Sequence, residues 1–142
     1  MENLLYAVPV IGAISLVVAL MLKSWIGKQD EGNDRMKEIS GYIRVGAMAF
    51  LVREYKMVAA FAVALLLIVA IFISPIAAIA CLFGAAFSVL AGYIGMKTAT
   101  DANVRTTNAA SKGGMPAALK IAFRGGAVMG LCVVGLGLLG VS

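Results

Sequence analysis

The sequence lacks histidine altogether, which removes the commonest general base and the commonest metal ligand of proteins. It has only two cysteines, Cys81 and Cys132, both in apolar stretches, so the disulfide framework of a small secreted domain is not indicated. Charged residues are scarce, at 13% of the chain against 62% hydrophobic residues, whereas a soluble domain has about 45–50% apolar residues. These absences exclude an ordinary soluble domain and predict a protein of the lipid bilayer.

Charge is missing from four long stretches, and these are the candidate membrane spans. They cover residues 3–22, 57–73, 76–96 and a last stretch, 121–142, that has no charged residue from position 125 onward. A helix needs about 20 apolar residues to cross the hydrocarbon core of a bilayer. The pattern predicts an all-α integral membrane protein with four transmembrane helices in one membrane region, residues 1–142.

The basic residues lie in only two segments. Seven stand between the first and second predicted spans and five follow the third: Lys23, Lys28, Arg35, Lys37, Arg44, Arg53 and Lys56, then Lys97, Arg105, Lys112, Lys120 and Arg124. Lysine and arginine in short loops stay on the cytoplasmic side of a membrane. Both charged segments are therefore predicted to be cytoplasmic, and both chain termini are predicted to lie on the opposite, non-cytoplasmic side.

Two of the predicted helices extend beyond the bilayer. Apolar residues recur every three or four positions over 34–56, which indicates an amphipathic helix that continues into the span at 57–73. Asn33 or Asp34 suits the N-cap of this helix. The third span is predicted to continue over 97–110, where charges of alternating sign stand four residues apart and favour ion pairs along the helix: Lys97, Asp101 and Arg105. Glycines at 113–114 then end that helix, and Pro116 begins the next.

Small residues are frequent in the spans and predict close helix packing. Gly126 and Gly130 form a GxxxG pair, and small residues let helix backbones approach closely in lipid. Two interpretations remain open for this pair. It packs helices against one another inside the chain, or it joins copies of the chain into an oligomeric ring.

The residues that chemistry requires are largely absent. No predicted span holds the ionisable side chain that an ion-driven rotor subunit or a small drug exporter needs within the membrane. The one acidic cluster has four members, which suit the positive start of a helix better than a magnesium site: Asp30, Glu31, Asp34 and Glu38. There is no phosphate-binding loop and no nucleophile–base pair. We therefore predict no catalytic, cofactor-binding or metal-binding residue, and no nucleic-acid partner.

Three stretches resemble a known family. "DRMKEISGYIRVGAMAFLVREYK" (34–56), "GYIGMKTATDANVRTTNAA" (92–110) and "PAALKIAFRGGAVMGLCVVGLGLLG" (116–140) are similar to the N-terminal region of the membrane-integral, ion-pumping inorganic pyrophosphatases, in order, spacing and helix context. The likeness extends over nearly the whole chain from Leu4 onward. Asp101 departs from it, because that position is often basic in the family.

The resemblance implies a fold, an activity and cofactors. Members of this family hydrolyse pyrophosphate with Mg²⁺ on the cytoplasmic side and move H⁺ or Na⁺ out across the membrane, and some also need K⁺. They have about sixteen transmembrane helices per subunit in two rings and form homodimers. The first four helices belong to the outer ring. The aspartate-rich catalytic motifs stand further along the family's chains, so no catalytic position carries over to a residue here.

These observations predict the N-terminal fragment of a pyrophosphate-energised ion pump, a translocase and hydrolase of a bacterial inner or plasma membrane. The short last stretch, which ends without a basic or aromatic anchor, favours a truncated chain. By itself the chain is expected to be inactive and to pack against the remaining helices of the pump. The alternative is a self-standing four-helix scaffold or accessory subunit without enzymatic activity. A weaker hypothesis is that the basic surplus of the cytoplasmic segments attracts anionic lipid or polyphosphate.

Overall fold

The chain folds into helices joined by two short connections. The structure, a computed structural model, describes the backbone of residues 2–141 and the side chains of residues 6–141. Its elements are α1 (Glu2–Gly27), α2 (Asp34–Phe72) and α3 (Pro75–Val141). Each of the three is long and apolar enough to cross a membrane. The all-helical class is therefore as predicted from the sequence.

The helix α2 begins where its N-cap residue stands. The side-chain oxygen of Asn33 accepts a hydrogen bond from the backbone N–H of Met36 at 2.9 Å, which satisfies one of the donors that a helix start leaves without a partner. From Asp34 the helix runs without a break to Phe72. Asn33, one of the two predicted N-caps, is thus confirmed. The amphipathic stretch at 34–56 and the apolar stretch at 57–72 form one continuous helix.

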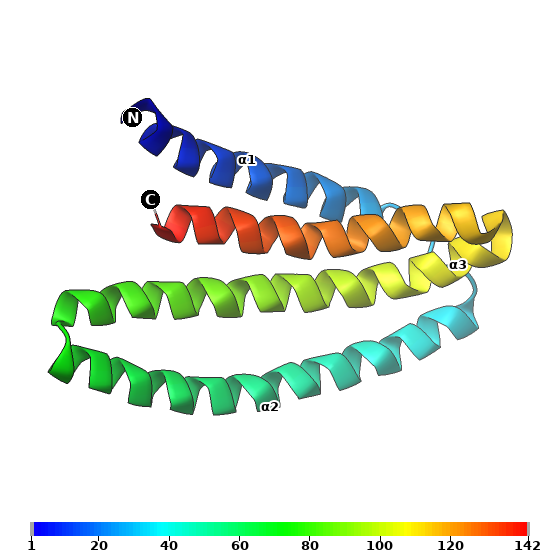
Figure 1. Cartoon of the computed structure of the whole chain (residues 1–142). Helices are drawn as coiled ribbons and strands as arrows, with labels where there is room; N and C mark the ends of the chain where they lie inside the picture. The colour runs from blue at the N-terminus through cyan, green and yellow to red at the C-terminus, as the bar shows by residue number, and fades with distance from the viewer. Residues whose placement is uncertain (1, 142) are drawn as a thin grey trace.

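The predicted count of four helices is not matched, because the structure has three. Helix α3 covers 67 residues, and these include the segment at which the sequence predicted a helix end. Within it, Gly114 alone has a non-helical backbone, with φ 68° and ψ −167°. Figure 1 shows that the ribbon turns back on itself there, in the region coloured yellow to orange. We refer to residues 75–113 as the first half of α3 and to residues 115–141 as its second half.

Only glycine adopts the backbone conformation of Gly114 without strain. We expect Gly114→Ala to lower the free energy of unfolding by about 2 kcal/mol, since a Cβ at such a conformation costs on the order of 1–3 kcal/mol. Unfolding of the chain by dodecyl sulfate in detergent micelles measures the change. Gly41→Ala is the matched control, because Gly41 is helical and a Cβ there would meet nothing within 4 Å. Equal stability of the two variants would contradict the prediction.

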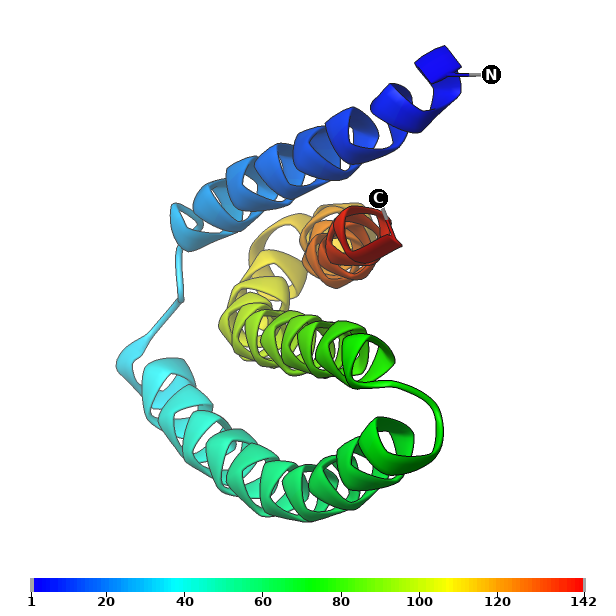
Figure 2. The same cartoon turned by 90° about the vertical axis from the view of Figure 1, so that its left-hand side faces the viewer.

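The two halves of α3 pack against each other, and α1 and α2 flank them. In the end-on view of Figure 2, α1 lies beside the second half of α3 and α2 beside the first half. The buried core lies where α1 meets both halves: Ala19, Ile26, Ala102, Ile121, Val128 and Cys132. Most of these side chains are small, so the helices approach closely. The Arg124 guanidinium also lies 3.8 Å from the centre of the Trp25 ring and ties α1 to the second half of α3.

Two glycines bring the backbones of α1 and the second half of α3 together. A Cβ built on Gly12 of α1 would lie 3.0 Å from the carbonyl oxygen of Gly135, and one built on Gly135 would lie 2.9 Å from that of Gly12. By contrast, a Cβ on Gly126 or Gly130 would meet nothing within 4 Å in the described part of the chain. The GxxxG pair of the sequence therefore does not make the internal contact, and a pair 123 residues apart makes it instead.

The chain termini and the turns between helices are divided between the two ends of the helix array. Figure 1 places both termini at the same end as the connection between α2 and α3. The loop between α1 and α2 lies at the other end, together with the reversal at Gly114. Large apolar side chains such as Phe61, Leu67 and Phe72 of α2 are exposed, as expected for helix faces that meet lipid or further helices rather than water.

Candidate functional site

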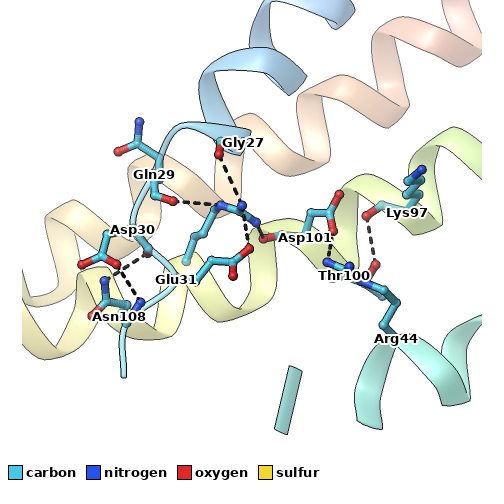
Figure 3. A network of polar contacts seen from close by, with 11 residues as sticks. Gly27, Gln29, Asp30, Glu31, Arg44, Lys97, Thr100, Asp101 and Asn108 are labelled. Carbon is cyan, nitrogen blue, oxygen red and sulfur yellow. Dashed lines mark hydrogen bonds and ion pairs between the residues drawn. The ribbon is translucent and has the colours of Figure 1, made fainter. Parts of the chain in front are cut away.

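A network of polar contacts joins the α1–α2 loop to the first half of α3 (Figure 3). We call it the loop network. The loop, residues 28–33, lies along one face of α3, and that face presents four polar side chains at spacings of four, three and four residues: Asp101, Arg105, Asn108 and Lys112. These spacings put all four on one side of a helix. The network therefore has one rigid helical wall and one loop that is held against it.

Arg105 lies at the centre of the loop network. Its residue is only 7% exposed, and its guanidinium donates to the carbonyl oxygens of Gln29 at 3.0 Å, Gly27 at 3.3 Å and Asp101 at 2.6 Å. It also pairs with the Glu31 carboxylate at 2.8 Å. Burial of a charge is costly unless the group is paired and hydrogen-bonded, and here the guanidinium has four partners.

The position of Arg105 explains how α1 ends. The last carbonyl groups of a helix have no partner within the helix, and they carry the negative end of its dipole. Gly27 is the last residue of α1, and its carbonyl and that of Gln29 both accept from the guanidinium. Arg105 is thus a capping group that comes from 78 residues away in the chain. It fixes the direction in which the loop leaves α1.

A second set of contacts holds the loop further along. The Asn108 amide donates to the carbonyl oxygen of Asp30 at 3.0 Å, and the Lys112 ammonium donates to the Asp30 carboxylate at 2.6 Å. The other Asp30 oxygen accepts from the backbone N–H of Gly32 at 3.0 Å. Gly32 has φ 85°, and a Cβ there would lie 2.5 Å from the Met36 sulfur, so glycine is required at this turn.

These contacts lower the pKa of Asp30. The hydrogen bond from Lys112 is the largest cause, followed by the bond from the Gly32 amide, because both favour the charged carboxylate. A depressed folded-state pKa stabilises the fold fully above the unfolded value, about 3.9, and this stabilisation disappears as pH falls through the folded pKa. We expect Lys112→Gln to raise the titration midpoint of the Asp30 carboxyl carbon in an NMR titration. An unchanged midpoint would show that Lys112 is not its partner.

The predicted ion pairs along the first half of α3 are not formed. Asp101 pairs with Arg44 of α2 at 2.5 Å, and Arg105 bonds to the backbone carbonyl of Asp101 rather than to its carboxylate. No ion pair between described side chains involves Lys97. The predicted ion pairs among Lys97, Asp101 and Arg105 are therefore wrong. Asp101 and Arg105 instead contact partners from α2 and from the α1–α2 loop.

The acidic cluster of the sequence is dispersed among basic partners. Asp30 pairs with Lys112, Glu31 with Arg105, Asp34 with Lys37 at 3.7 Å and Glu38 with Arg35 at 2.7 Å. Across residues 2–141, as far as the structure describes them, no three histidine, cysteine or acidic residues come together as a metal site. The residues present thus do not fit a Mg²⁺ centre. The loop network can hold three helices in register, and its donors are satisfied by the protein itself.

The sequence pattern does not predict that Arg105 and Asn108 are buried. An arginine just beyond a predicted span is ordinarily exposed, and the partners of both side chains are loop carbonyls, which leave no sequence pattern. The stripe at 101, 105, 108 and 112 shows that these side chains share one helix face, but a polar face is also ordinary for a helix exposed to water.

Comparisons with known proteins place the chain in a family. Residues 13–142 match the family model described as inorganic H⁺ pyrophosphatase. A K⁺-insensitive pyrophosphate-energized proton pump of Methanosarcina mazei is 48% identical over 144 residues, covering 100% of this chain and 21% of its own length. A K⁺-stimulated pyrophosphate-energized sodium pump of Thermotoga maritima is 46% identical over 114 residues, covering 80% of this chain and 16% of its own length.

A third relative agrees. It is a K⁺-insensitive pyrophosphate-energized proton pump of Moorella thermoacetica, 44% identical over 140 residues, with coverage of 95% of this chain and 20% of its own length. The chain thus spans about a fifth of the length of the curated relatives it matches. With three apolar helices and relatives that are membrane pumps, it is an integral membrane protein. The chain belongs to the inorganic H⁺ pyrophosphatase family.

Proposed function

We propose that the chain forms the N-terminal, outer-ring part of a pump that couples cytoplasmic pyrophosphate hydrolysis to the export of H⁺ or Na⁺. The observation that carries the proposal is the identity of 44–48% to relatives named as pyrophosphate-energized pumps, over 95–100% of this chain in two of them. Both proton and sodium pumps, and both K⁺-stimulated and K⁺-insensitive pumps, are among these relatives. The ion is therefore left as H⁺ or Na⁺, and activation by K⁺ is left open between these two types of relative.

The chain by itself is proposed to be catalytically inactive. The pyrophosphate and Mg²⁺ of the reaction need several converging carboxylates, and the acidic side chains of the loop network are each paired with a lysine or arginine. We propose that the Mg²⁺ ligands come from the rest of the pump. The chain then contributes a scaffold against which the catalytic helices pack.

The proposed topology has four crossings of the membrane. The two halves of α3 would each cross once, with the reversal at Gly114 on the cytoplasmic side, and both termini would lie on the non-cytoplasmic side. The arrangement in Figure 1 supports this proposal, because the α1–α2 loop and the Gly114 reversal lie at the same end. Twelve basic residues flank these two turns in the sequence, in agreement with the positive-inside rule.

The partners proposed are the lipid bilayer, the remaining helices of the pump and a second subunit. A groove of about 480 Å³ between the two halves of α3 is lined partly by glycines, including Gly84, Gly137 and Gly140. Small residues let another helix approach closely in lipid. The groove thus suits a further helix of the pump. No nucleic-acid partner is proposed.

A chimera tests the function. The chain replaces the matched 144-residue region of the Methanosarcina mazei proton pump, and pyrophosphate hydrolysis and proton uptake are measured in vesicles. We expect both activities in the chimera and neither in the chain alone. A stable but inactive chimera would overturn the pump assignment and favour the free-standing scaffold. Hydrolysis by the chain alone would overturn its proposed inactivity.

Side-specific labelling tests the topology. In a variant with both native cysteines replaced by alanine, single cysteines are introduced as Lys28→Cys, Lys112→Cys and Ser74→Cys. A membrane-impermeant maleimide applied to sealed inside-out vesicles should label the first two positions and spare the third. Labelling of positions 28 and 112 from opposite sides would contradict four crossings.

A further inference from the structure

Two cavities meet at Lys23, at the end of α1 that carries the loop network. The first, which we call the headgroup cavity, has a volume of about 390 Å³ and is lined by Lys23, Ser24, Gly27, Thr98 and Asp101 together with Leu20 and Ile26. The second, the acyl groove, has a volume of about 190 Å³ and lies between α1 and both halves of α3. Leu20 and Lys23 line both, so the two cavities adjoin at these side chains.

The two cavities differ in chemistry along the helix axis. The acyl groove is lined by aliphatic side chains, among them Leu16, Leu90, Ile94 and Leu136. Moving one to two turns toward the α1–α2 loop along both helices, Lys23 and Ser24 on α1 and Thr98 and Asp101 on α3 replace them. An apolar groove beside a cavity that carries several polar side chains, with a cation where the two adjoin, has the amphipathic order of a phospholipid.

Thr98 has an unmet polar group beside this cavity. The residue is 1% exposed, and its hydroxyl has no hydrogen-bond partner among the residues that the structure describes. Threonine in a helix usually bonds back to a carbonyl one turn earlier, as Thr100 does to Met96 and Thr107 to Asn103. A buried hydroxyl without a partner is destabilising, so an acceptor oxygen brought to it by a ligand in the adjoining cavity would stabilise the fold.

The charges around the headgroup cavity favour an anion. No ion pair between described side chains involves Lys23, so its ammonium is available. Asp101 is the one carboxylate that lines the cavity, and its charge is balanced by Arg44 at 2.5 Å. The net charge offered to a ligand is therefore that of Lys23, with the hydroxyls of Ser24 and Thr98 as hydrogen-bond donors.

We propose that the headgroup cavity and the acyl groove together bind one anionic phospholipid of the cytoplasmic leaflet. Its phosphate lies at Lys23, Ser24 and Thr98, and part of one acyl chain lies in the groove between α1 and α3. The site rests on the topology proposed above, which puts Lys23 at the cytoplasmic surface, where anionic headgroups are found. Free phosphate has the same headgroup chemistry, but it would leave the adjoining acyl groove unfilled.

Lipid retention by the 142-residue chain tests the site. The chain is purified in mild detergent, exchanged into phosphatidylglycerol or phosphatidylcholine, and examined by native mass spectrometry. We expect one phosphatidylglycerol to be retained on the chain and phosphatidylcholine to be retained several-fold less. Removal of the Lys23 charge by Lys23→Gln should weaken phosphatidylglycerol retention roughly fivefold, the effect of about 1 kcal/mol per cation near a membrane surface. Lys120→Gln makes the same charge change on an exposed residue that lines neither cavity, and should leave retention unchanged.

Thr98→Val provides a second variant that does not alter charge. It keeps the shape of the side chain and removes the unmet hydroxyl, so it should weaken retention about fivefold or more if the hydroxyl donates to a phosphate. If Thr98 were only a packing residue, this variant would bind lipid as the parent does. Equal retention of the two lipids by the parent, or full retention by both variants, would overturn the proposal.

Two further comparisons distinguish a lipid site from a site for soluble phosphate and from the proposed pump function. Millimolar inorganic phosphate is added to the chain in phosphatidylcholine, and the thermal unfolding midpoint is recorded. A rise equal to that given by phosphatidylglycerol would assign the cavity to soluble phosphate and overturn the lipid assignment. Failure of the pump chimera would leave lipid retention unaffected, and failure of lipid retention would leave the activity of the chimera unaffected, so the two proposals are tested separately.

Discussion

Replacement of Arg105 by methionine is expected to destabilise the chain by about 3 kcal/mol. Methionine keeps much of the volume of the side chain and removes every donor. The Glu31 carboxylate and the carbonyl groups of Gly27 and Gln29 would then lose their partner. Loss of one member of a buried ion pair costs about 3–5 kcal/mol, and the lower end applies because the Glu31 side chain is 37% exposed. Unfolding by dodecyl sulfate from mild-detergent micelles measures the loss.

Two variants give this prediction its controls. Arg35→Met removes an arginine whose side chain is 73% exposed and whose ion pair lies on the surface of α2, so it should change stability by less than about 1 kcal/mol. Arg105→Lys keeps the charge but loses the planar fork that reaches several carbonyl oxygens at once, and we expect an intermediate loss. If Arg105→Met and Arg35→Met had the same effect, the capping role would be wrong.

Replacement of Gly135 by leucine is expected to separate α1 from α3. A Cβ alone at this position would lie 2.8 Å from the Leu16 side chain and 2.9 Å from the Gly12 carbonyl oxygen. A backbone oxygen cannot move aside as a flexible side chain can, so the helices would have to shift. Overpacking of this kind costs about 1–3 kcal/mol for added methylene groups, and four added carbon atoms at a backbone contact put the cost at about 3 kcal/mol or above.

Gly130→Leu is the matched control, because Gly130 lies in the same half of α3 and a Cβ there would meet nothing within 4 Å. We expect its stability to stay within about 0.5 kcal/mol of the parent, as for an ordinary surface substitution. A cysteine pair engineered between α1 and the second half of α3 would report the separation directly, through slower cross-linking in Gly135→Leu. Equal cross-linking of the two variants would show that the glycine crossing is dispensable.

The helices could be predicted from the sequence because lipid imposes a strong pattern. Uncharged stretches of about 20 residues have few other interpretations, and the apolar stripe over 34–56 marks the continuation of α2. The turn at 113–114 was also visible, as paired glycines before Pro116. In the structure Gly114 alone leaves the helical conformation there, and α3 continues on both sides of it.

The loop network could not be predicted, because its bonds depend on tertiary position. Asp101 was expected to pair within its own helix, and its partner Arg44 is 57 residues away. The contact between Gly12 and Gly135 could not be predicted either, because the two glycines share no sequence motif. The recognisable GxxxG pair, by contrast, makes no close contact with another described helix. Local spacing shows which residues share a helix face, but only the packing of helices decides which face meets which partner.

The stacking of Arg124 on Trp25 gives the molecule a built-in optical reporter. Trp25 is the one tryptophan of the chain, and a guanidinium from the far end of the sequence lies over its ring. Indole emission responds to the field of a nearby charge, so its wavelength and lifetime should differ between a docked and an undocked first helix. Assembly of the chain during membrane insertion can thus be followed in real time without any added label.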